Sequence, residues 1–274
     1  MTAVTAPTSI GELAELLPRR VEQHYGPGSR IETVRRALAA YAGDARPVQP
    51  AALAELETAA QTVFKHLELT YQPGLVPQRQ SSGWPEPDLA EISRGGADIA
   101  VVKRGPDGAG TIRLTGLAPV RAAAPLLAGA FTLLQHADPI ILDLRDNGGG
   151  DPATVAFIVD WLTGDEPRQL FDVVYRDRVR QWWTAGGSSV PAPKGTVRAL
   201  IGSGTYSSGE ALAWVLKDQG LATLIGEPTR GAADHVVPLA ITHDVHALIP
   251  EASVVTVDGR PTWEGSGVTP DSAV

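Results

Sequence analysis

The first quarter of the chain carries apolar residues at helical spacing, interrupted by proline and glycine. Ser9 and Ser29 each stand three residues before a glutamate, the spacing of a capping box, and each begins an apolar stripe. Pro50 opens a third stripe, which continues at three- and four-residue spacing as far as Leu67. The pattern therefore predicts three short helices that form a small helical N-terminal subdomain over residues 1–71.

A different pattern begins close to His66. Apolar and polar residues alternate over 67–71, which predicts a strand. Residues 72–97 are rich in Pro, Gly, Gln and Ser, and we expect them to form a loop or lid. From there to the end, strand-like and helical runs alternate, which predicts a mixed α/β domain over residues 98–274. The helices expected in this domain are 122–134, 153–162 and 210–216, and the expected strands are 99–102, 111–114, 140–144, 172–175, 197–201, 222–226 and 241–250.

Composition narrows the classes of function. The chain has 274 residues and a formal charge of −8, with its charges scattered, so we expect neither nucleic acid nor a membrane as a partner. The absence of cysteine excludes disulfides, a thiol nucleophile and a cysteine metal site. The N-terminus does not resemble a signal peptide and no apolar run is long enough to span a bilayer. We therefore expect a cytoplasmic protein.

Ser207 stands where a predicted strand ends and a predicted helix begins. The strand is 197–201, Gly202 and Gly204 form the turn, and Glu210 follows the serine at capping-box spacing. A hydroxyl at this place lies near the positive end of the helix dipole and beside unpaired N–H groups. Those groups are suited to stabilising an oxyanion. The alternative is that Ser207 only caps the helix.

A glycine-rich loop follows the apolar run 139–145, which is typical of a strand buried on both faces. It contains Gly148 to Gly150, after which Asp151 and Pro152 are expected to begin a helix. The loop lacks the Gly-Lys-Ser/Thr ending of a phosphate loop, which leaves a tight turn or half of an oxyanion hole. Three side chains are expected to brace the loop rather than to react: Asp143, Arg145 and Asn147.

Four segments resemble, in this order, those of peptidase family S41: ILDLRDNGGG, TYSSGEALAWVLKDQG, IGEPTRG and TWEGSGVTPD. That family includes carboxy-terminal processing peptidases, the tricorn core and the repeats of interphotoreceptor retinoid-binding protein. The chain is most similar to the bacterial branch that resembles interphotoreceptor retinoid-binding protein. The resemblance implies an α/β fold with a crotonase-like (ClpP-like) spiral of ββα units and a helical N-terminal subdomain. A PDZ domain is not expected, because residues 72–97 are too few to hold one.

The resemblance also implies a serine hydrolase that cleaves a peptide or related acyl bond through an acyl-enzyme. Ser207 would be the nucleophile, and Glu210, the glutamate of its motif, is expected to be a structural brace. The N–H groups of Ser208 and of Gly148 or Gly149 would form the oxyanion hole.

The general base is where the chain departs from the tail-specific proteases, because Ala232 occupies the position of their lysine. The tricorn-like arrangement offers His66 and Glu264 instead. A neutral imidazole would take the proton of the serine, and a carboxylate would orient the ring. Lys65 stands where the tricorn core has a serine, and His235 is the alternative base.

Other assignments complete the expectations. His243 and His246 have the spacing of a helical metal pair but lie in a predicted strand, where they would face opposite sides, so we expect neither a metal nor a cofactor.

Two alternative functions stay open: a dedicated acyl-transfer or cyclising enzyme that uses the same site, and a non-catalytic protein that binds apolar ligands. The tryptophans that could line its pocket are Trp182, Trp183, Trp214 and Trp263. The sequence leaves the substrate and the oligomeric state open.

Overall fold

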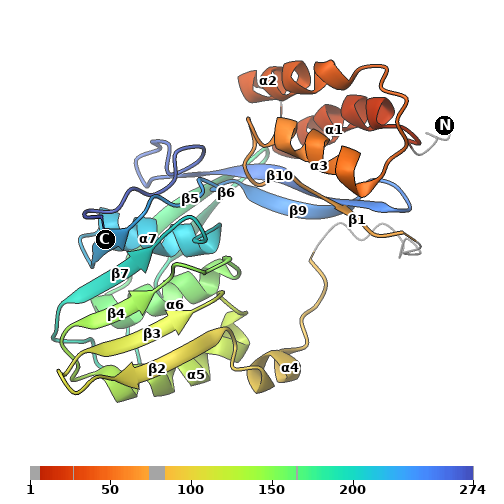
Figure 1. Ribbon diagram of the computed structural model, residues 1–274. Helices are drawn as coiled ribbons and strands as arrows, with labels where there is room; N and C mark the ends of the chain where they lie inside the picture. Colours follow the sequence, from red (N-terminus) through yellow and green to blue (C-terminus); the bar gives the residue numbers. More distant parts are fainter. Residues whose placement is uncertain (1–6, 27, 74–83, 165, 274) are drawn as a thin grey trace. The chain divides into compact units, whose positions relative to one another are not determined.

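The computed structural model describes residues 7–26, 28–73, 84–164 and 166–273 (Figure 1). The chain divides into two compact units. Unit 1 comprises Met1–Pro85, Val174–Val179 and Asp234–Ser253, and unit 2 comprises Glu86–Val173, Arg180–Ala233 and Val254–Val274. The domain limits expected from the sequence (1–71, 72–97 and 98–274) stay predictions, and the structural division adds two later segments to the N-terminal unit.

The described residues form a mixed α/β fold. The helices are α1 (Ile10–Tyr25), α2 (Ser29–Leu38), the 3₁₀ helix η1 (Ala39–Tyr41), α3 (Pro50–Ala60), α4 (Leu89–Arg94), α5 (Val120–Leu134), α6 (Pro152–Thr163) and α7 (Ser208–Asp218). The strands are β1 (Glu68–Tyr71), β2 (Ile99–Arg104), β3 (Gly110–Leu114), β4 (Ile140–Asp143), β5 (Gln169–Tyr175), β6 (Val179–Trp183), β7 (Val197–Ile201), β8 (Thr223–Gly226), β9 (His235–Ala240) and β10 (Val245–Val255).

The helices of unit 1 bury their apolar stripes against strands β1, β9 and β10 in one hydrophobic core. The predicted cap of α1 is confirmed, because the Ser9 hydroxyl accepts a hydrogen bond from Glu12 N–H at 3.3 Å. The predicted cap at Ser29 is wrong. Gly28 occupies the N-cap position of α2 instead, and no side chain caps this helix.

Helix α3 is shorter than the sequence predicts. It ends at Ala60, after which the N–H groups of Thr62 and Val63 bond to the carbonyls three residues earlier, at 3.3 and 3.0 Å, in the tighter pattern of a 3₁₀ turn. Phe64 and Leu67 are fully buried on this turn. The expected strand then follows as β1, which pairs antiparallel with β10.

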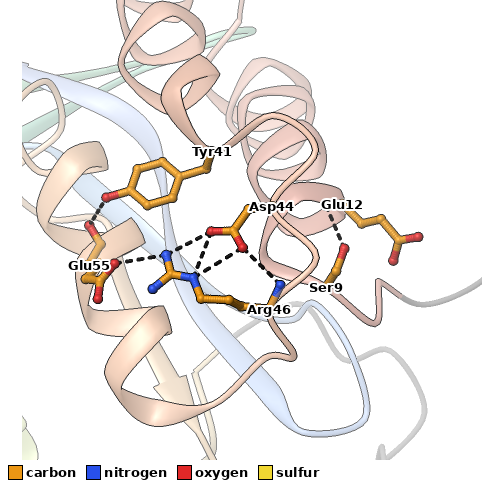
Figure 2. A network of polar contacts seen from close by, with 6 residues as sticks. All are labelled: Ser9, Glu12, Tyr41, Asp44, Arg46 and Glu55. Atoms are coloured by element: carbon orange, nitrogen blue, oxygen red, sulfur yellow. Dashed lines mark hydrogen bonds and ion pairs between the residues drawn. The ribbon is translucent and has the colours of Figure 1, made fainter.

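A polar network holds the connection between η1 and α3 (Figure 2). Asp44 accepts from Arg46 Nε and Nη2 at 3.0 and 2.8 Å, and Arg46 Nη2 also reaches Glu55 on α3 at 3.0 Å. Tyr41 donates its hydroxyl proton to the main-chain carbonyl of Glu55 at 3.1 Å. Because Arg46 and Glu55 are exposed to solvent and Asp44 is partly exposed, each pair stabilises the fold little, and the network serves mainly to fix the path of the loop.

The prediction of one strand over residues 241–250 is wrong. The chain forms a hairpin there, in which β9 ends at Ala240 and β10 begins at Val245. The Thr242 hydroxyl accepts from the N–H groups of Asp244 and Val245, both at 3.0 Å, and so closes the turn. His243 therefore lies in an exposed turn and His246 on β10, rather than on opposite faces of one strand.

The sheet of unit 2 has the strand order β2-β3-β4-β7-β8. Strands β2 and β3 pair antiparallel, and the remaining pairs are parallel. Helices α5, α6 and α7 pack in sequence along this sheet (Figure 1). The carboxyl ends of parallel strands meet at one edge, where ligands of open α/β sheets usually bind. The loops after β4 and β7, which carry the glycines and Ser207, both leave from that edge.

Two adjacent helices show the packing that supports this sheet. Phe131 of α5 stacks on Trp161 of α6 with the ring centroids 3.8 Å apart. The predicted start of α6 is confirmed: Asp151 is its N-cap, with a carboxylate that accepts from Ala153 N–H at 2.9 Å, and Pro152 is its first residue.

The second sheet has the order β1-β10-β5-β6, with β9 paired to β10. The sequence did not predict strands β6 and β9.

Within the expected loop 72–97, residues 74–83 lie outside the described residues, and helix α4 forms after them. Asp88 Oδ1 caps α4 by accepting from the N–H groups of Ala90 and Glu91, both at 3.0 Å. In the described part of the chain, no helix has both the length and the apolar character that crossing a membrane requires.

Candidate active site

Ser207 has a strained backbone. It lies between the end of β7 and the first residue of α7, as predicted, but its φ of 53° and ψ of −125° are not those of an ordinary N-cap. A residue with a Cβ rarely adopts this conformation, which costs about 1–3 kcal/mol and persists only where the surroundings impose it. The side chain is half-buried. Sharp strand-to-helix turns of this kind expose the nucleophile in several hydrolases.

Glu210 is the group that fixes the Ser207 peptide. Its fully buried carboxylate accepts from Ser207 N–H at 3.0 Å. It also accepts from the Thr229 hydroxyl at 2.6 Å, Gly231 N–H at 2.6 Å and Ala232 N–H at 2.9 Å. Burial raises the pKa of Glu210, and these hydrogen bonds act in the opposite direction. One carboxylate thus joins the serine turn to the loop that follows β8.

Gly149 packs directly against Ser207. A Cβ on this glycine would lie 2.7 Å from Ser207 Cβ and 2.9 Å from the Tyr206 carbonyl oxygen, and its φ of +90° also favours glycine. Nearby, the Ser208 hydroxyl donates to the Gly150 carbonyl at 2.8 Å. The absence of a side chain at Gly149 therefore allows the glycine loop and the serine turn to meet.

Asn147 ties three segments together through a fully buried side chain. Its amide donates to the carbonyl of Leu114, the last residue of β3, at 3.1 Å and to that of Gly116, just after β3, at 3.2 Å. Its side-chain oxygen accepts from Gly149 N–H at 3.0 Å, and its main-chain carbonyl accepts from Tyr206 N–H at 2.9 Å. Asn147 thus connects the end of β3, the glycine loop and the serine turn, and its role as a brace stays a prediction.

The N–H groups near Ser207 differ in their acceptors. Gly148 N–H donates to the Thr115 carbonyl at 3.0 Å, and Gly149 N–H is bonded to Asn147. By contrast, the N–H groups of Ser208 and Gly150 have no acceptor among the residues that the structure describes. Ser208 N–H is therefore the predicted oxyanion donor that is available without rearrangement.

Asp143 and Arg145 form a bidentate ion pair where β4 ends. Arg145 Nε and Nη2 donate to the two carboxylate oxygens at 2.8 and 2.7 Å. The Arg145 hydrogen bonds lower the pKa of Asp143, against the effect of burial. Between them, the Leu144 carbonyl accepts from the Thr205 hydroxyl at 2.7 Å, which links the end of β4 to the serine turn.

Glu264 binds the same loop as Glu210. Its half-buried carboxylate accepts from Ala233 N–H at 2.7 Å, and Gly265 N–H donates to the Gly231 carbonyl at 2.7 Å. Trp263, which precedes it, is buried against Trp214. The C-terminal motif and the loop after β8 are therefore interlocked within unit 2.

The two candidate bases belong to unit 1. His66 is buried in the turn before β1, with Nδ1 2.5 Å from the Asp234 main-chain oxygen. Because a carbonyl only accepts, Nδ1 carries a proton, and in the neutral ring the lone pair is then on Nε2. His235 begins β9, with Nδ1 3.2 Å from Glu251 Oε1 and 3.5 Å from the Tyr175 hydroxyl.

The structure thus groups the predicted site residues within each unit. Unit 2 holds Ser207, Ser208, the glycine loop and both glutamates in one hydrogen-bonded assembly. Unit 1 holds His66 in the tautomer that a base for serine requires. The described residues contain no cluster of His, Asp and Glu that could hold a metal ion. The bond from His66 to a main-chain oxygen, invisible to sequence motifs, is the feature that sequence analysis missed.

Comparison with known proteins identifies a family that shares these motifs. The model of peptidase family S41 matches residues 108–274. Carboxyl-terminal-processing peptidase 2, chloroplastic, of Arabidopsis thaliana is 33% identical over 113 residues, which cover 41% of this chain and 20% of that protein. The carboxyl-terminal-processing protease of Synechocystis sp. is 37% identical over 98 residues, which cover 35% of this chain and 22% of that protein. The matched region therefore spans about a fifth of these relatives.

Solved structures share the fold over almost the whole chain. A candidate peptidase from Parabacteroides merdae has a TM-score of 0.67 at 15% identity and covers 98% of this chain and 90% of its own. The photosystem II D1 C-terminal processing protease has a TM-score of 0.54 at 17% identity, with coverage of 98% and 94%. At these identities the likeness establishes a shared fold.

The Asp143–Arg145 pair predicts a pH dependence of stability. The folded-state pKa of Asp143 lies below its unfolded value, so its contribution is present above the unfolded pKa of about 3.9 and is lost as the pH falls through the folded one. The difference in unfolding free energy between wild type and Asp143→Asn should therefore be largest near neutrality and shrink below about pH 4. Urea titrations from pH 3 to pH 7 measure it, and a difference independent of pH would contradict this account.

Gly149→Ala should destabilise the protein. The new Cβ would meet Ser207 Cβ at 2.7 Å and would be held at a positive φ, which costs about 1–3 kcal/mol for the backbone alone. Gly129→Ala is the matched control, because its Cβ would enter open space on α5 and should stabilise that helix by roughly 0.5–1 kcal/mol. Thermal unfolding of both variants decides the matter; equal melting temperatures would show that the contact is unimportant.

Glu210→Gln should also lower stability. A carboxamide presents NH₂ where the carboxylate accepted, so at least one buried donor loses its acceptor, at about 1–3 kcal/mol per unsatisfied group. Glu227→Gln, which changes an exposed glutamate just beyond β8, is the control. Chemical denaturation that leaves Glu210→Gln as stable as Glu227→Gln would refute the assignment of Glu210 as the brace.

Proposed function

Because this chain belongs to peptidase family S41, whose model matches more than half of it, we propose that it is a serine peptidase with Ser207 as its nucleophile. The observation that carries this proposal is the strained backbone of Ser207, imposed by a fully buried glutamate and by a glycine in contact with the serine. A serine that merely capped a helix would need no such strain.

The reaction follows from this assignment. Ser207 Oγ attacks the carbonyl carbon of a peptide bond while its proton passes to His66 Nε2. The tetrahedral intermediate collapses to an acyl-enzyme, and the leaving amine takes that proton. A water molecule then attacks the ester and gives a proton to His66, which returns it to Ser207 Oγ as the acid is released.

The oxyanion would be held by N–H groups beside Ser207. Ser208 N–H supplies one donor, and it has no acceptor among the described residues. The second predicted donor is Gly148 or Gly149, and Gly149 is the one in contact with Ser207. Its N–H would have to exchange the Asn147 oxygen for the oxyanion.

The supporting roles of the carboxylates and of the second histidine are proposals as well. Glu264 holds Ala233 through its N–H, and orientation of His66 by Glu264 stays a prediction. His235 stays the alternative base. Alanine, fully buried at position 232, stands where the tail-specific proteases use a lysine, so that base is not available at this position.

We also propose four features of the fold and origin of the protein. They are a crotonase-like spiral of ββα units, the lack of a PDZ domain, a bacterial origin and a cytoplasmic location. What supports the first is the βα alternation of unit 2, with its parallel strands β3, β4, β7 and β8. Transfer of the acyl group to an acceptor other than water would use the same site.

A second candidate function, the binding of an apolar ligand, is favoured by one observation. Trp182, Phe171, Trp263 and Trp214 form a chain of aromatic contacts in unit 2, with centroids 5.8–6.5 Å apart. The buried indole N–H groups of Trp182 and Trp263 have no acceptor among the described residues. Packing of core aromatic residues explains the contacts equally well, so the peptidase is the better-supported function.

Labelling with a fluorophosphonate, read by intact mass, tests the proposed mechanism. Wild type should gain one adduct and Ser207→Ala none, because only an activated serine reacts. Ser203→Ala, which removes an exposed serine of the same turn, should label like wild type. The rate should fall at acidic pH, because a protonated imidazole cannot accept the proton of Ser207.

Two histidine variants identify the base. His66→Gln should slow the labelling by on the order of 100-fold or more, whereas His235→Gln should leave it near the wild-type rate. The reverse result would assign the base to His235. Wild-type rates in both variants would refute a histidine base, and an adduct on Ser207→Ala would refute Ser207 as the nucleophile.

A further inference from the structure

Unit 1 contains a buried carboxylate, Asp234, whose side chain is only 1% exposed. Arg30 Nη2 lies 2.8 Å from Asp234 Oδ2, and the Tyr25 hydroxyl donates to Oδ1 at 3.4 Å. Removing the cationic partner of a buried carboxylate strongly destabilises the folded state, because the remaining charge is buried without compensation. The conformation of the chain at Asp234 therefore depends on Arg30.

The three N-terminal helices fix the position of Arg30. From the start of α2, it donates to the Tyr25 hydroxyl at the end of α1 at 2.7 Å and to the Val63 carbonyl after α3 at 2.8 Å. Its guanidinium lies over the Phe64 ring, 4.1 Å from the centroid. The Tyr25 hydroxyl in turn is 2.7 Å from Ser253 Oγ. Only a planar fork of donors can make these bonds together.

Both ends of the His66–Asp234 hydrogen bond are thus held by Arg30. Val63 and Phe64 belong to the turn that carries His66, and Asp234 supplies the carbonyl that faces His66 Nδ1 at 2.5 Å. That carbonyl keeps the proton on Nδ1 and the lone pair on Nε2. A shift of either segment would lengthen or break this hydrogen bond and so weaken its preference for the Nδ1–H tautomer of His66.

We infer that Arg30 is a positioning residue for the general base, because it holds in register the turn of His66 and the Asp234 carbonyl that fixes the tautomer of that imidazole. The inference deepens the proposed function and rests on it, since it assumes that His66 takes the proton of Ser207. It also gives the helical N-terminal segment a role in the chemistry: the three helices support a base that lies beyond them in the chain.

The tautomer of His66 tests the inference without any measurement of activity. Long-range ¹H–¹⁵N spectra of the full-length protein labelled with ¹⁵N-histidine distinguish Nδ1–H from Nε2–H imidazole, and the signal lost in His66→Gln assigns the residue. At about pH 8, where an ordinary imidazole is neutral, wild type should show Nδ1–H. Arg30→Met should show a mixture of both tautomers or Nε2–H. An unchanged Nδ1–H signal in Arg30→Met would overturn the inference.

The fluorophosphonate reaction gives a second readout. Arg30→Met should label Ser207 more slowly by on the order of 10- to 100-fold, because a small displacement of a catalytic group is costly. Arg30→Lys retains the charge but not the planar fork, so an intermediate rate and a partly restored Nδ1–H signal are expected; it is also the variant to measure if Arg30→Met does not fold. Arg35→Met is the matched control, because Arg35 lies on the same helix and pairs with the exposed Glu22 and Glu32.

The outcomes separate the two proposals. Wild-type labelling in Arg30→Met and Arg30→Lys would overturn the positioning role. Equal slowing in Arg35→Met would overturn it as well, because the effect would then come from any loss of charge on α2. If wild type is not labelled at all, the proposed peptidase fails, while the tautomer spectra still decide whether Arg30 controls His66.

Discussion

The local structure around Ser207 depends on one buried carboxylate. Glu210 receives hydrogen bonds from the serine N–H and from three groups of the loop after β8. Its burial is tolerated because every partner is a donor, so the desolvated charge is compensated by short hydrogen bonds. The S-x-x-E spacing of a helix cap thus acts here over a long range: the glutamate joins a serine turn to a loop some twenty residues later, and both keep conformations that neither would hold alone.

Close packing at glycine complements this carboxylate. Gly149 leaves room for Ser207, and Asn147 anchors the glycine loop to the end of β3 and to the serine turn. Parallel pairing of β3, β4 and β7 brings the ends of these strands to one edge of the sheet. The sheet therefore sets the approximate meeting point of the loops, and buried polar groups with few alternative partners set the final geometry.

Sequence patterns were informative where the constraint was local. The caps at Ser9 and Asp151 and the strand-to-helix turn at Ser207 depend on neighbouring residues, and the structure has all three. The patterns failed where a second local interaction competed with the expected one. Gly28 replaced Ser29 as a cap, Thr242 closed a turn inside an expected strand, and α3 ended at Ala60 in favour of a buried turn. The hydrogen bond of His66 to a main-chain oxygen could not be read from side-chain identities at all.

The segment from Thr229 to Asp234 concentrates these constraints, because the chain passes from unit 2 into unit 1 between Ala233 and Asp234. Glu210 and Glu264 hold its first part by their carboxylates, and Arg30 holds Asp234. The conformation of the proposed nucleophile is thus determined within one unit and the tautomer of the proposed base within the other. A defect in either can be recognised separately: loss of Glu210 acts on the Ser207 backbone, and loss of Arg30 acts on an imidazole proton. Family resemblance assigns candidate residues to a reaction, but it is these main-chain hydrogen bonds that would make a serine and a histidine competent for it.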